Sequence, residues 1–275
     1  LLDVDPVSFN IDTSAIKRAI TSKTKAIVPV HLFGLAANMD EIMDIANTHN
    51  LFVIEDNAQG IGGVYTSKDG TKKKTGTIGH VASTSFFPSK NLGCYGDGGA
   101  IFTNDDDLAH TIRGIVNHGM YQRYHHDVVG VNSRLDSIQA AVLRIKLREL
   151  DNYIERRNKA AHFYDEAFKD ISEISIPKRV DSSNHVFHQY TLKLNDEVNR
   201  DALVQFLASK EIPAMIYYPV PAHKQKMFAD LNTECGNLEV TNWLTSRVFS
   251  LPMHTELTLE HQNYIVKTIK EYIKK

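Results

Sequence analysis

A short apolar run that ends in two acidic residues, Leu51-Phe52-Val53-Ile54-Glu55-Asp56, constrains the fold of this 275-residue chain more than any other stretch. Buried parallel strands have nearly continuous apolar sequences, and open α/β sheets bind ligands at the carboxyl ends of such strands. The preceding residues predict a short helix through Ile20, a strand at residues 25–30 and a helix that begins at Asn38. This alternation indicates an α/β fold with a mostly parallel sheet.

The remaining elements follow from helix caps and periodic apolar residues. Asn38 and Glu41 have the spacing of a capping box, in which two side chains satisfy backbone N–H groups at a helix start. Residues 136–168 predict a long helix with one buried apolar stripe, formed by Ile138, Ala141, Val142, Ile145 and Leu147. We also expect a solvated hairpin at residues 65–77, strands at residues 81–87, 100–103, 185–194 and 214–217, and helices that begin at Asp105, Asn199 and Thr258.

One lysine, Lys90, follows the strand expected at residues 81–87 and precedes four glycines, the first of them Gly93. Its neighbours are apolar or small, and no carboxylate in the same turn offers it a partner. Such a lysine tends to lose solvent, which lowers its pKa and makes the neutral amine available as a nucleophile. The glycines let the backbone fold tightly beside a bulky ligand. The alternative interpretation is a solvated lysine in a loop.

Asp56 favours the first interpretation, because it ends the strand before Lys90 and the two residues can converge at neighbouring strand ends. An aspartate and a lysine in this arrangement suit pyridoxal phosphate (PLP). The lysine holds the cofactor covalently, and the carboxylate keeps the pyridine nitrogen protonated, so that the ring accepts electrons. The sequence therefore predicts a PLP site with Lys90 and Asp56 as its catalytic residues.

Several stretches together resemble the DegT/DnrJ/StrS family of sugar-nucleotide aminotransferases, PLP enzymes of the aspartate-aminotransferase fold (fold type I). They occur in the family's order and reach from near the start of the chain to its middle, with looser matches later. The matching stretches are PVHLFG at residues 29–34, EDNAQ at 55–59, SFFPSKNLG at 85–93, GDGGA at 96–100, NHG at 117–119, GVNSRLD at 130–136, YYPVP at 217–221 and SLPM at 250–253.

The resemblance implies roles for further residues. Gln59 matches a position that packs beside the cofactor ring, and Ser85 matches a hydroxyl that binds its phosphate. Asn132 matches an asparagine that reaches the phosphate across a homodimer, so that the two subunits share their active sites. Arg134 either clamps a carboxylate or phosphate of the substrate or pairs with Asp136. Tyr218 and His223 would contact the sugar nucleotide, with ordinary core packing as the alternative for the tyrosine.

The resemblance also implies a reaction. The closest match is to aminotransferases that act on UDP-2-acetamido-2-deoxy-3-oxo-glucuronate, with L-glutamate as amino donor, in the biosynthesis of O-antigen and related surface polysaccharides. A dTDP-linked 3-keto-6-deoxyhexose is the alternative substrate. Two other functions stay open: a dehydratase, against which Lys90 argues because such relatives carry histidine there, and a non-catalytic or fragmentary protein of the same fold.

The resemblance further predicts two domains, with a boundary near Arg156. Residues 1–156 would form the PLP-binding large domain, and residues 157–275 a smaller α+β domain. In the family a long amino-terminal portion precedes the stretch that begins at Leu1 here, so we expect the large domain to be incomplete at its amino terminus. That portion carries a helix end that binds the cofactor phosphate.

Composition excludes several classes of partner. The formal net charge is −2, which gives no reason to expect nucleic acid or a membrane surface as a partner. Cys94 and Cys235 make no disulfide framework, and the histidines of residues 118–126 lack the spacing of zinc ligands, so we expect no metal. No apolar run approaches the length of a membrane span. These observations predict a cytoplasmic protein.

Overall fold

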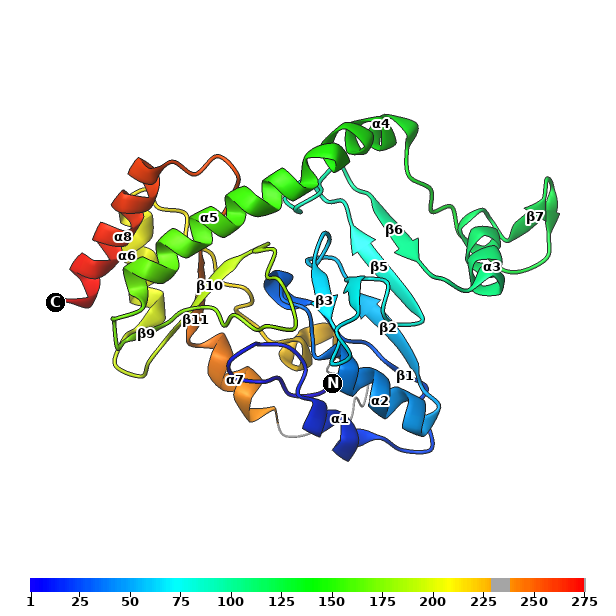
Figure 1. Cartoon of the computed structure of the whole chain (residues 1–275), viewed down its shortest axis with the longest axis horizontal. Helices are drawn as coiled ribbons and strands as arrows, with labels where there is room; N and C mark the ends of the chain where they lie inside the picture. Colours follow the sequence, from blue (N-terminus) through cyan, green and yellow to red (C-terminus); the bar gives the residue numbers. More distant parts are fainter. Residues whose placement is uncertain (229–237, 275) are drawn as a thin grey trace.

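The computed structural model describes residues 1–228 and 238–274, which form an elongated molecule around one long helix. That helix, α5 (Leu150–Phe168), runs from the sheet of the amino-terminal part to the carboxyl-terminal elements (Figure 1). Cys235 lies outside the described residues. None of the helices within the described ranges is long and apolar enough to cross a membrane.

The central sheet has four strands in the order β1-β2-β5-β6. β1 (Ala26–Ile27), β2 (Phe52–Asp56) and β5 (Val81–Ser85) are parallel, and β6 (Gly99–Phe102) pairs with β5 in the antiparallel direction. The prediction of a mostly parallel sheet is confirmed. Asp56 pairs with Ser83, so the carboxyl ends of β2 and β5 lie side by side. This register places the residues after the two strands at one edge of the sheet.

Two helices pack on the amino-terminal sheet. α1 (Thr13–Ala19) is capped by Asp12, whose side chain accepts a hydrogen bond from the Ser14 N–H. α2 (Met39–His49) buries Met39, Ile42, Ile45 and Ala46. The predicted capping box of α2 is wrong, because the Asn38 side chain caps no backbone N–H and instead donates to Glu41. Thr13 and Lys17 of α1 also donate to that carboxylate, which therefore joins the two helices.

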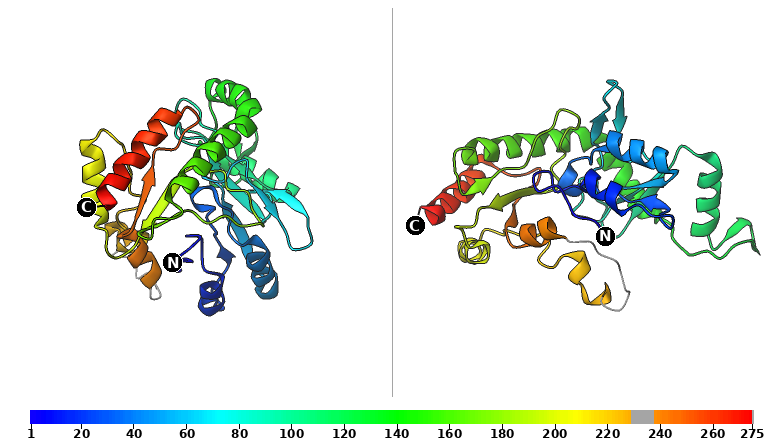
Figure 2. Two further views of the ribbon diagram at one scale, coloured as in Figure 1. Left: turned by 60° about the vertical axis from the view of Figure 1, so that its left-hand side comes forward. Right: turned by 90° about the horizontal axis from the view of Figure 1, so that it is seen from below.

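Two hairpins extend from this sheet. β3 (Val64–Thr66) and β4 (Lys72–Lys74) form the expected solvated hairpin. α3 (Asp106–Val116), capped by Asp105, leads into β7 (Met120–Gln122) and β8 (His125–His126). α3 and this second hairpin form an arm that projects from the rest of the chain (Figures 1 and 2).

The predicted long helix at residues 136–168 is broken, and its predicted buried stripe is wrong. α4 (Ser137–Lys146) and α5 are separated by a 3-10 turn, η2 (Leu147–Glu149). Ile138 is 78% exposed and Ile145 is 69% exposed. The physical reason is that no element among residues 1–228 and 238–274 covers this face of α4, which lies at the margin of the molecule (Figure 1).

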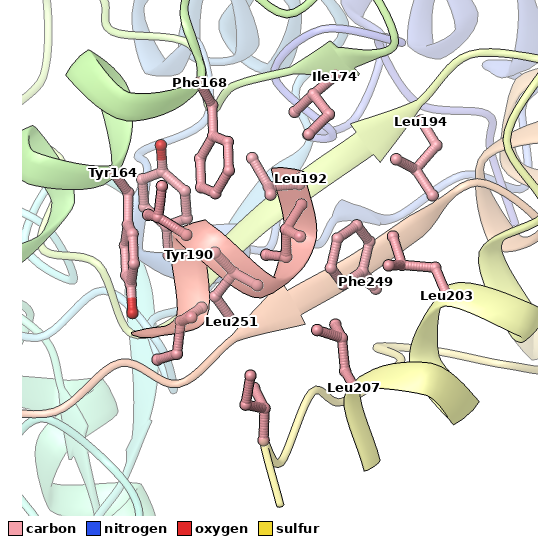
Figure 3. Packing of buried hydrophobic residues seen from close by; sticks show 14 of the residues in the cluster. Tyr164, Phe168, Ile174, Tyr190, Leu192, Leu194, Leu203, Leu207, Phe249 and Leu251 are labelled. Carbon is pink, nitrogen blue, oxygen red and sulfur yellow. The ribbon is translucent and has the colours of Figure 1, made fainter. Parts of the chain in front are cut away.

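The carboxyl-terminal part is built on a three-stranded antiparallel sheet in the order β11-β10-β9. Its strands are β9 (Ile174–Ser175), β10 (Tyr190–Leu194) and β11 (Val248–Leu251). Helices α5, α6 (Arg200–Ser209) and α8 (Leu259–Ile273) bury apolar side chains against it (Figure 3). This sheet and its helices form an α+β unit with its own core. A short helix, α7 (Glu239–Thr245), precedes β11.

Two predicted strands of this part differ from the structure. Residues 185–189 are not extended, because Phe187 has a positive φ of 45°, so β10 begins only at Tyr190. Residues 214–217 form no strand, and only Met215 pairs with Ser250. Separate apolar clusters lie in the two parts of the chain. The division at Arg156 stays a prediction, since α5 passes through that residue without a break.

Candidate active site

Lys90 lies in a tight turn that follows β5. The Lys90 N–H donates to the Phe87 carbonyl at 2.9 Å, and the Cys94 N–H donates to the Phe86 carbonyl at 2.8 Å. A Cβ on Gly93 would lie 2.5 Å from the Pro88 carbonyl oxygen, so this position of the turn requires glycine. The turn aims the half-buried Lys90 side chain into a cavity.

This cavity of about 410 Å³ brings together several residues that the sequence had singled out. Its volume falls within the range of typical small-molecule sites. Lys90, Ser85, Gln59 and Tyr218 line it. The other lining residues are Phe87, Ser89, Asp97, Gly98, His188, Gln189 and Tyr217. Four parts of the chain that are distant in sequence therefore meet here.

The charge state of Lys90 follows from this placement. Burial lowers the pKa of Lys90 below its ordinary value, and the negative charge of Asp56 opposes that shift in part. A lowered pKa raises the fraction of neutral amine, which is the nucleophilic form. Asp56 Oδ1 accepts a hydrogen bond from the Ala58 N–H at 3.0 Å. Within the described ranges, Oδ2 of Asp56 accepts none.

Glu55, which precedes Asp56, forms a buried pair with His31. The sequence analysis assigned a role to neither residue. His31 Nε2 and the Gly76 N–H donate to Glu55 Oε2 at 2.8 and 2.7 Å. The N–H groups of Ile78 and Gly79 donate to Oε1 at 2.7 and 2.6 Å. Burial alone would raise the pKa of Glu55, but the bonds from His31 and the backbone outweigh it and hold this pKa below its ordinary value.

The alternation of side chains along a strand is the sequence signal that could have distinguished the roles of Glu55 and Asp56. Consecutive residues of a strand face opposite sides of the sheet, so only one of the two acids points toward a ligand. His31 also fixes the backbone of Asp56, because the His31 N–H donates to the Asp56 carbonyl at 3.0 Å. The pair thus holds the strand end from which Asp56 projects.

Gln59 and Tyr218, which both line the cavity, are joined by a hydrogen bond. Gln59 Nε2 donates to the Tyr218 hydroxyl at 3.2 Å, and Gln59 Oε1 accepts from the Phe33 N–H at 2.6 Å. Tyr218 also lines a neighbouring apolar cavity of about 340 Å³ with Phe33. His223 lines neither cavity; its Nε2 lies 3.2 Å from Asn242 Oδ1.

Asn132 and Arg134 lie outside the cavity that contains Lys90. Both are exposed, between the arm and α4. Arg134 Nε donates to Asn132 Oδ1 at 3.0 Å, and no ion pair joins Arg134 to Asp136. The guanidinium therefore keeps its other donors available. Within residues 1–228 and 238–274, no three His, Cys, Asp or Glu side chains gather where they could hold a metal ion.

His188 is another residue of this site to which the sequence analysis assigned no role. It is 5% exposed and lines the cavity together with Lys90. The expected strand at residues 185–194 assigned it no role, and no local motif marks it. Only the turn at Phe187 brings it to the cavity, and this turn is not evident from the residue types.

The residues present fit a PLP molecule. Lys90 provides an amine with a lowered pKa to the cavity. Asp56 does not line the cavity, but its charge acts on Lys90, and it provides a carboxylate oxygen without a described partner. Ser85 adds a hydroxyl to the same cavity, where the amide side chain of Gln59 also lies. This donor set suits a pyridine nitrogen, a phosphate and a polar ring substituent.

Comparison with known proteins gives a consistent assignment. The DegT/DnrJ/EryC1/StrS aminotransferase family model matches residues 1–270. A "Pleiotropic regulatory protein" of Geobacillus stearothermophilus is 47% identical, over 98% of this chain and 71% of the relative. The UDP-N-acetyl-3-dehydro-alpha-D-glucosamine 3-aminotransferase of Acidithiobacillus ferrooxidans is 44% identical, over 98% of this chain and 70% of the relative.

Two further relatives bear on the substrate, and one solved structure bears on the fold. The UDP-2-acetamido-2-deoxy-3-oxo-D-glucuronate aminotransferase of Pseudomonas aeruginosa is 44% identical, over 93% of this chain and 68% of the relative. A dTDP-3-amino-3,6-dideoxy-alpha-D-galactopyranose transaminase of Aneurinibacillus thermoaerophilus is 39% identical, over 99% of this chain and 72% of the relative. The crystal structure of a DegT DnrJ EryC1 StrS aminotransferase from Brucella abortus matches with a TM-score of 0.89 and 40% identity, over 100% of this chain and 73% of that chain.

Proposed function

The chain belongs to the DegT/DnrJ/EryC1/StrS aminotransferase family, and we propose that it uses PLP to transfer an amino group to a keto-sugar nucleotide. The observation that carries this proposal is the environment of Lys90. Burial lowers the pKa of this lysine, and its side chain shares a cavity with Ser85 and Gln59. The charge of Asp56 acts on the same amine. UDP-linked 3-keto sugars are the substrates named for two relatives at 44% identity.

The roles of the residues follow from their positions. When bound, PLP acts as an electron sink for the carbon whose proton is removed. Lys90 would hold the cofactor covalently, and its Nζ, once free and neutral, would accept the proton from the amino donor and return one to the sugar carbon. The Asp56 carboxylate would hold a proton on the pyridine nitrogen. Ser85 would bind the phosphate, and Gln59 would lie beside the ring.

The finer assignment of the substrate rests on Arg134. We infer a UDP-linked 3-keto-hexuronate, because the guanidinium of Arg134 is exposed, has no ion-pair partner among the described residues, and suits a carboxylate. L-Glutamate would be the amino donor, and a surface polysaccharide the destination of the product. A dTDP-linked 3-keto-6-deoxyhexose is the alternative, favoured by the dTDP-sugar relative. Tyr218 lines the cavity and would contact the nucleotide sugar. His223, which does not line the cavity, would contact the nucleotide sugar as well.

The distance of Asn132 and Arg134 from the cavity supports a shared site. Neither lines the cavity of its own chain, and both lie in an exposed segment next to the uncovered face of α4. A second copy that covers this face would bring Asn132 to the phosphate and Arg134 to the substrate of its neighbour. We therefore propose a homodimer with shared active sites.

The cofactor lysine is testable by chemical trapping. The purified chain is mixed with PLP, scanned in the visible range, reduced with borohydride and mapped by peptide analysis. We expect a yellow band and a fixed adduct on Lys90. Lys146→Ala is the matched control, because Lys146 also contacts the Lys90 turn, through the Gly93 carbonyl, but lines no part of the cavity. An adduct that is absent, or that forms on Lys146, would contradict the proposal.

A further inference from the structure

The segment that carries His188 is fixed to the Lys90 turn. Asn91, the next residue after Lys90, is 5% exposed, and its Nδ2 donates to the Val186 carbonyl at 2.9 Å. The Val186 N–H in turn donates to the Gly34 carbonyl at 2.9 Å. A Cβ on Gly34, which has a φ of 100°, would lie 2.8 Å from Val186 Cγ2. These contacts join Val186 to the turn that carries Lys90.

Phe187 turns the chain so that His188 faces the cavity. Its φ of 45° places a bulky residue in the left-handed region, which is rare and is often found at functional sites. Arg157 of α5 stabilises this conformation from the other side. Its Nη1 donates to the carbonyls of Phe187 at 2.9 Å, of Met253 at 3.1 Å and of His188 at 3.4 Å. The position of the His188 ring is thus set by both parts of the chain.

The His188 ring is neutral and has no hydrogen-bond partner among residues 1–228 and 238–274. Burial, aided by the positive charges of Lys90 and Arg157, lowers the pKa of His188 to about 3. Nδ1 is buried without a hydrogen-bond partner. Nε2 has no partner among residues 1–228 and 238–274 either, but it is not sealed off, because the ring lines the cavity.

The environment also determines which nitrogen carries the proton. A neutral imidazole has one N–H donor and one acceptor nitrogen. A proton on Nδ1 would bury an unpaired N–H, which is more unfavourable than burying a bare nitrogen. The proton therefore resides on Nε2, and the ring presents a neutral donor to the cavity. Within the described part of the chain this donor has no acceptor, which is what a site built for a ligand oxygen would show.

We propose that His188 is a substrate-binding residue whose Nε2–H donates to an oxygen of the reactant bound beside Lys90. This inference rests on the proposed transamination. A neutral donor suits either a hydroxyl or carbonyl oxygen of the sugar or the carboxylate of the amino donor. In both cases the bond would orient the reacting carbon toward the Lys90 amine without adding a second positive charge to the cavity.

Three variants of His188 test whether the N–H donor at Nε2 is needed, as distinct from the size and the burial of the side chain. His188→Gln places an amide N–H near the position of Nε2, His188→Asn places it near Nδ1, and His188→Leu removes it. His185→Asn is the matched control. His185 is equally buried, and its pKa is also lowered to about 3, but its Nδ1 accepts from the Phe187 N–H and it does not line the Lys90 cavity. The asparagine keeps an acceptor for that N–H.

The first readout is steady-state kinetics of the holoenzyme with a UDP-linked 3-keto sugar and glutamate. We expect His188→Asn and His188→Leu to raise KM for one reactant by roughly 3- to 10-fold, the effect of one net hydrogen bond. His188→Gln should restore most of that loss, and His185→Asn should match the wild type. The reactant whose KM rises shows whether the acceptor belongs to the amino donor or to the sugar nucleotide.

The second readout does not depend on turnover. The ¹⁵N resonances of His188, assigned by their loss in His188→Gln, should show a protonated Nε2 and a bare Nδ1. Protonation at Nδ1, unchanged KM values in His188→Asn and His188→Leu, or equal losses in His188→Gln would overturn the inference. Loss of the PLP absorbance band in these variants would show that His188 supports the cofactor instead. Absence of turnover by the wild type would overturn the proposed function itself, and this role with it.

Discussion

Glu55 offers the sharpest test of how the site is held, because one substitution changes its charge and hydrogen bonding without changing its shape. The side chain is 0% exposed, and its two oxygens accept four hydrogen bonds. The Ala37 N–H donates to His31 Nδ1, so the His31 proton is on Nε2 and points at Glu55. Glu55→Gln replaces one of the two oxygens by an NH₂ group.

The loss of unfolding free energy in Glu55→Gln can be worked out from the number of donors on each oxygen. Each oxygen accepts two, so whichever way the glutamine amide is oriented, two buried N–H groups face another donor. A hydrogen bond to a charged group contributes about 1.5–3 kcal/mol. Loss of two such bonds therefore destabilises the fold by roughly 3–6 kcal/mol.

The assay is urea unfolding of the wild type and the variant, with the free energy of unfolding taken from the midpoint and slope. Glu256→Gln is the control. The Glu256 side chain is 75% exposed and pairs with Arg156, a surface ion pair whose loss changes stability by about 0–1 kcal/mol. A Glu55→Gln effect no larger than that of Glu256→Gln would refute the argument that four donors fix this carboxylate.

The same carboxylate predicts a pH dependence. Its pKa in the folded state lies below the ordinary value of 4.5, so its stabilising contribution is present above about pH 4.5 and is lost as the pH falls through the lowered pKa of the folded state. The difference in unfolding free energy between wild type and Glu55→Gln should therefore stay constant from pH 8 to about pH 5 and shrink only in acid. A difference that grows as the pH falls would contradict this sign.

Three further predictions concern charge and assembly. Asp56→Asn should lower the pKa of Lys90 further, because the aspartate charge opposes the effect of burial. In the cofactor-free chain, the midpoint of the pH dependence of Lys90 modification should therefore move to lower pH. An upward shift of this midpoint would contradict the prediction. Arg134→Ala should lower kcat/KM for a 3-keto-hexuronate by roughly 10- to 100-fold but for a 6-deoxy sugar only slightly, and equal losses would remove the reason for choosing the uronate. Lys90→Ala and Asn132→Ala, each inactive alone, should regain activity as verified heterodimers, and no recovery would place Asn132 in its own subunit's site.

The sequence predicted the part of the site that depends on strand ends. A continuous apolar run identified β2 and thereby located Asp56, and the glycines after Lys90 marked a turn that the structure confirms at Gly93. The parallel pairing of β2 with β5 then brings both residues to one edge. These features follow from local chemistry and from the geometry of parallel sheets. The geometry of neighbouring parallel strands is the same in every sheet, so it can be predicted from the strand pattern alone.

The parts that failed depend on what packs against an element. The apolar stripe of α4 was recognised as a stripe, yet a periodic pattern cannot say what covers it, and Ile138 and Ile145 are exposed. The strand expected at residues 185–194 starts late, because Asn91 and Arg157 hold the carbonyls of Val186 and Phe187 in a conformation that no local propensity favours. His188 therefore escaped notice.

One arrangement recurs around the cavity: a residue that lines or acts on it adjoins a buried polar residue that fixes the backbone. Glu55 precedes Asp56 and binds the loop at residues 76–79 through three backbone N–H donors, and buried Asn91 follows Lys90 and binds Val186. Consecutive side chains of a strand face opposite sides, so a strand end such as that of β2 can give one residue to the framework and the next to the chemistry. Substitutions of the buried member should therefore lower stability first, whereas those of its neighbour should lower activity in a chain that remains folded.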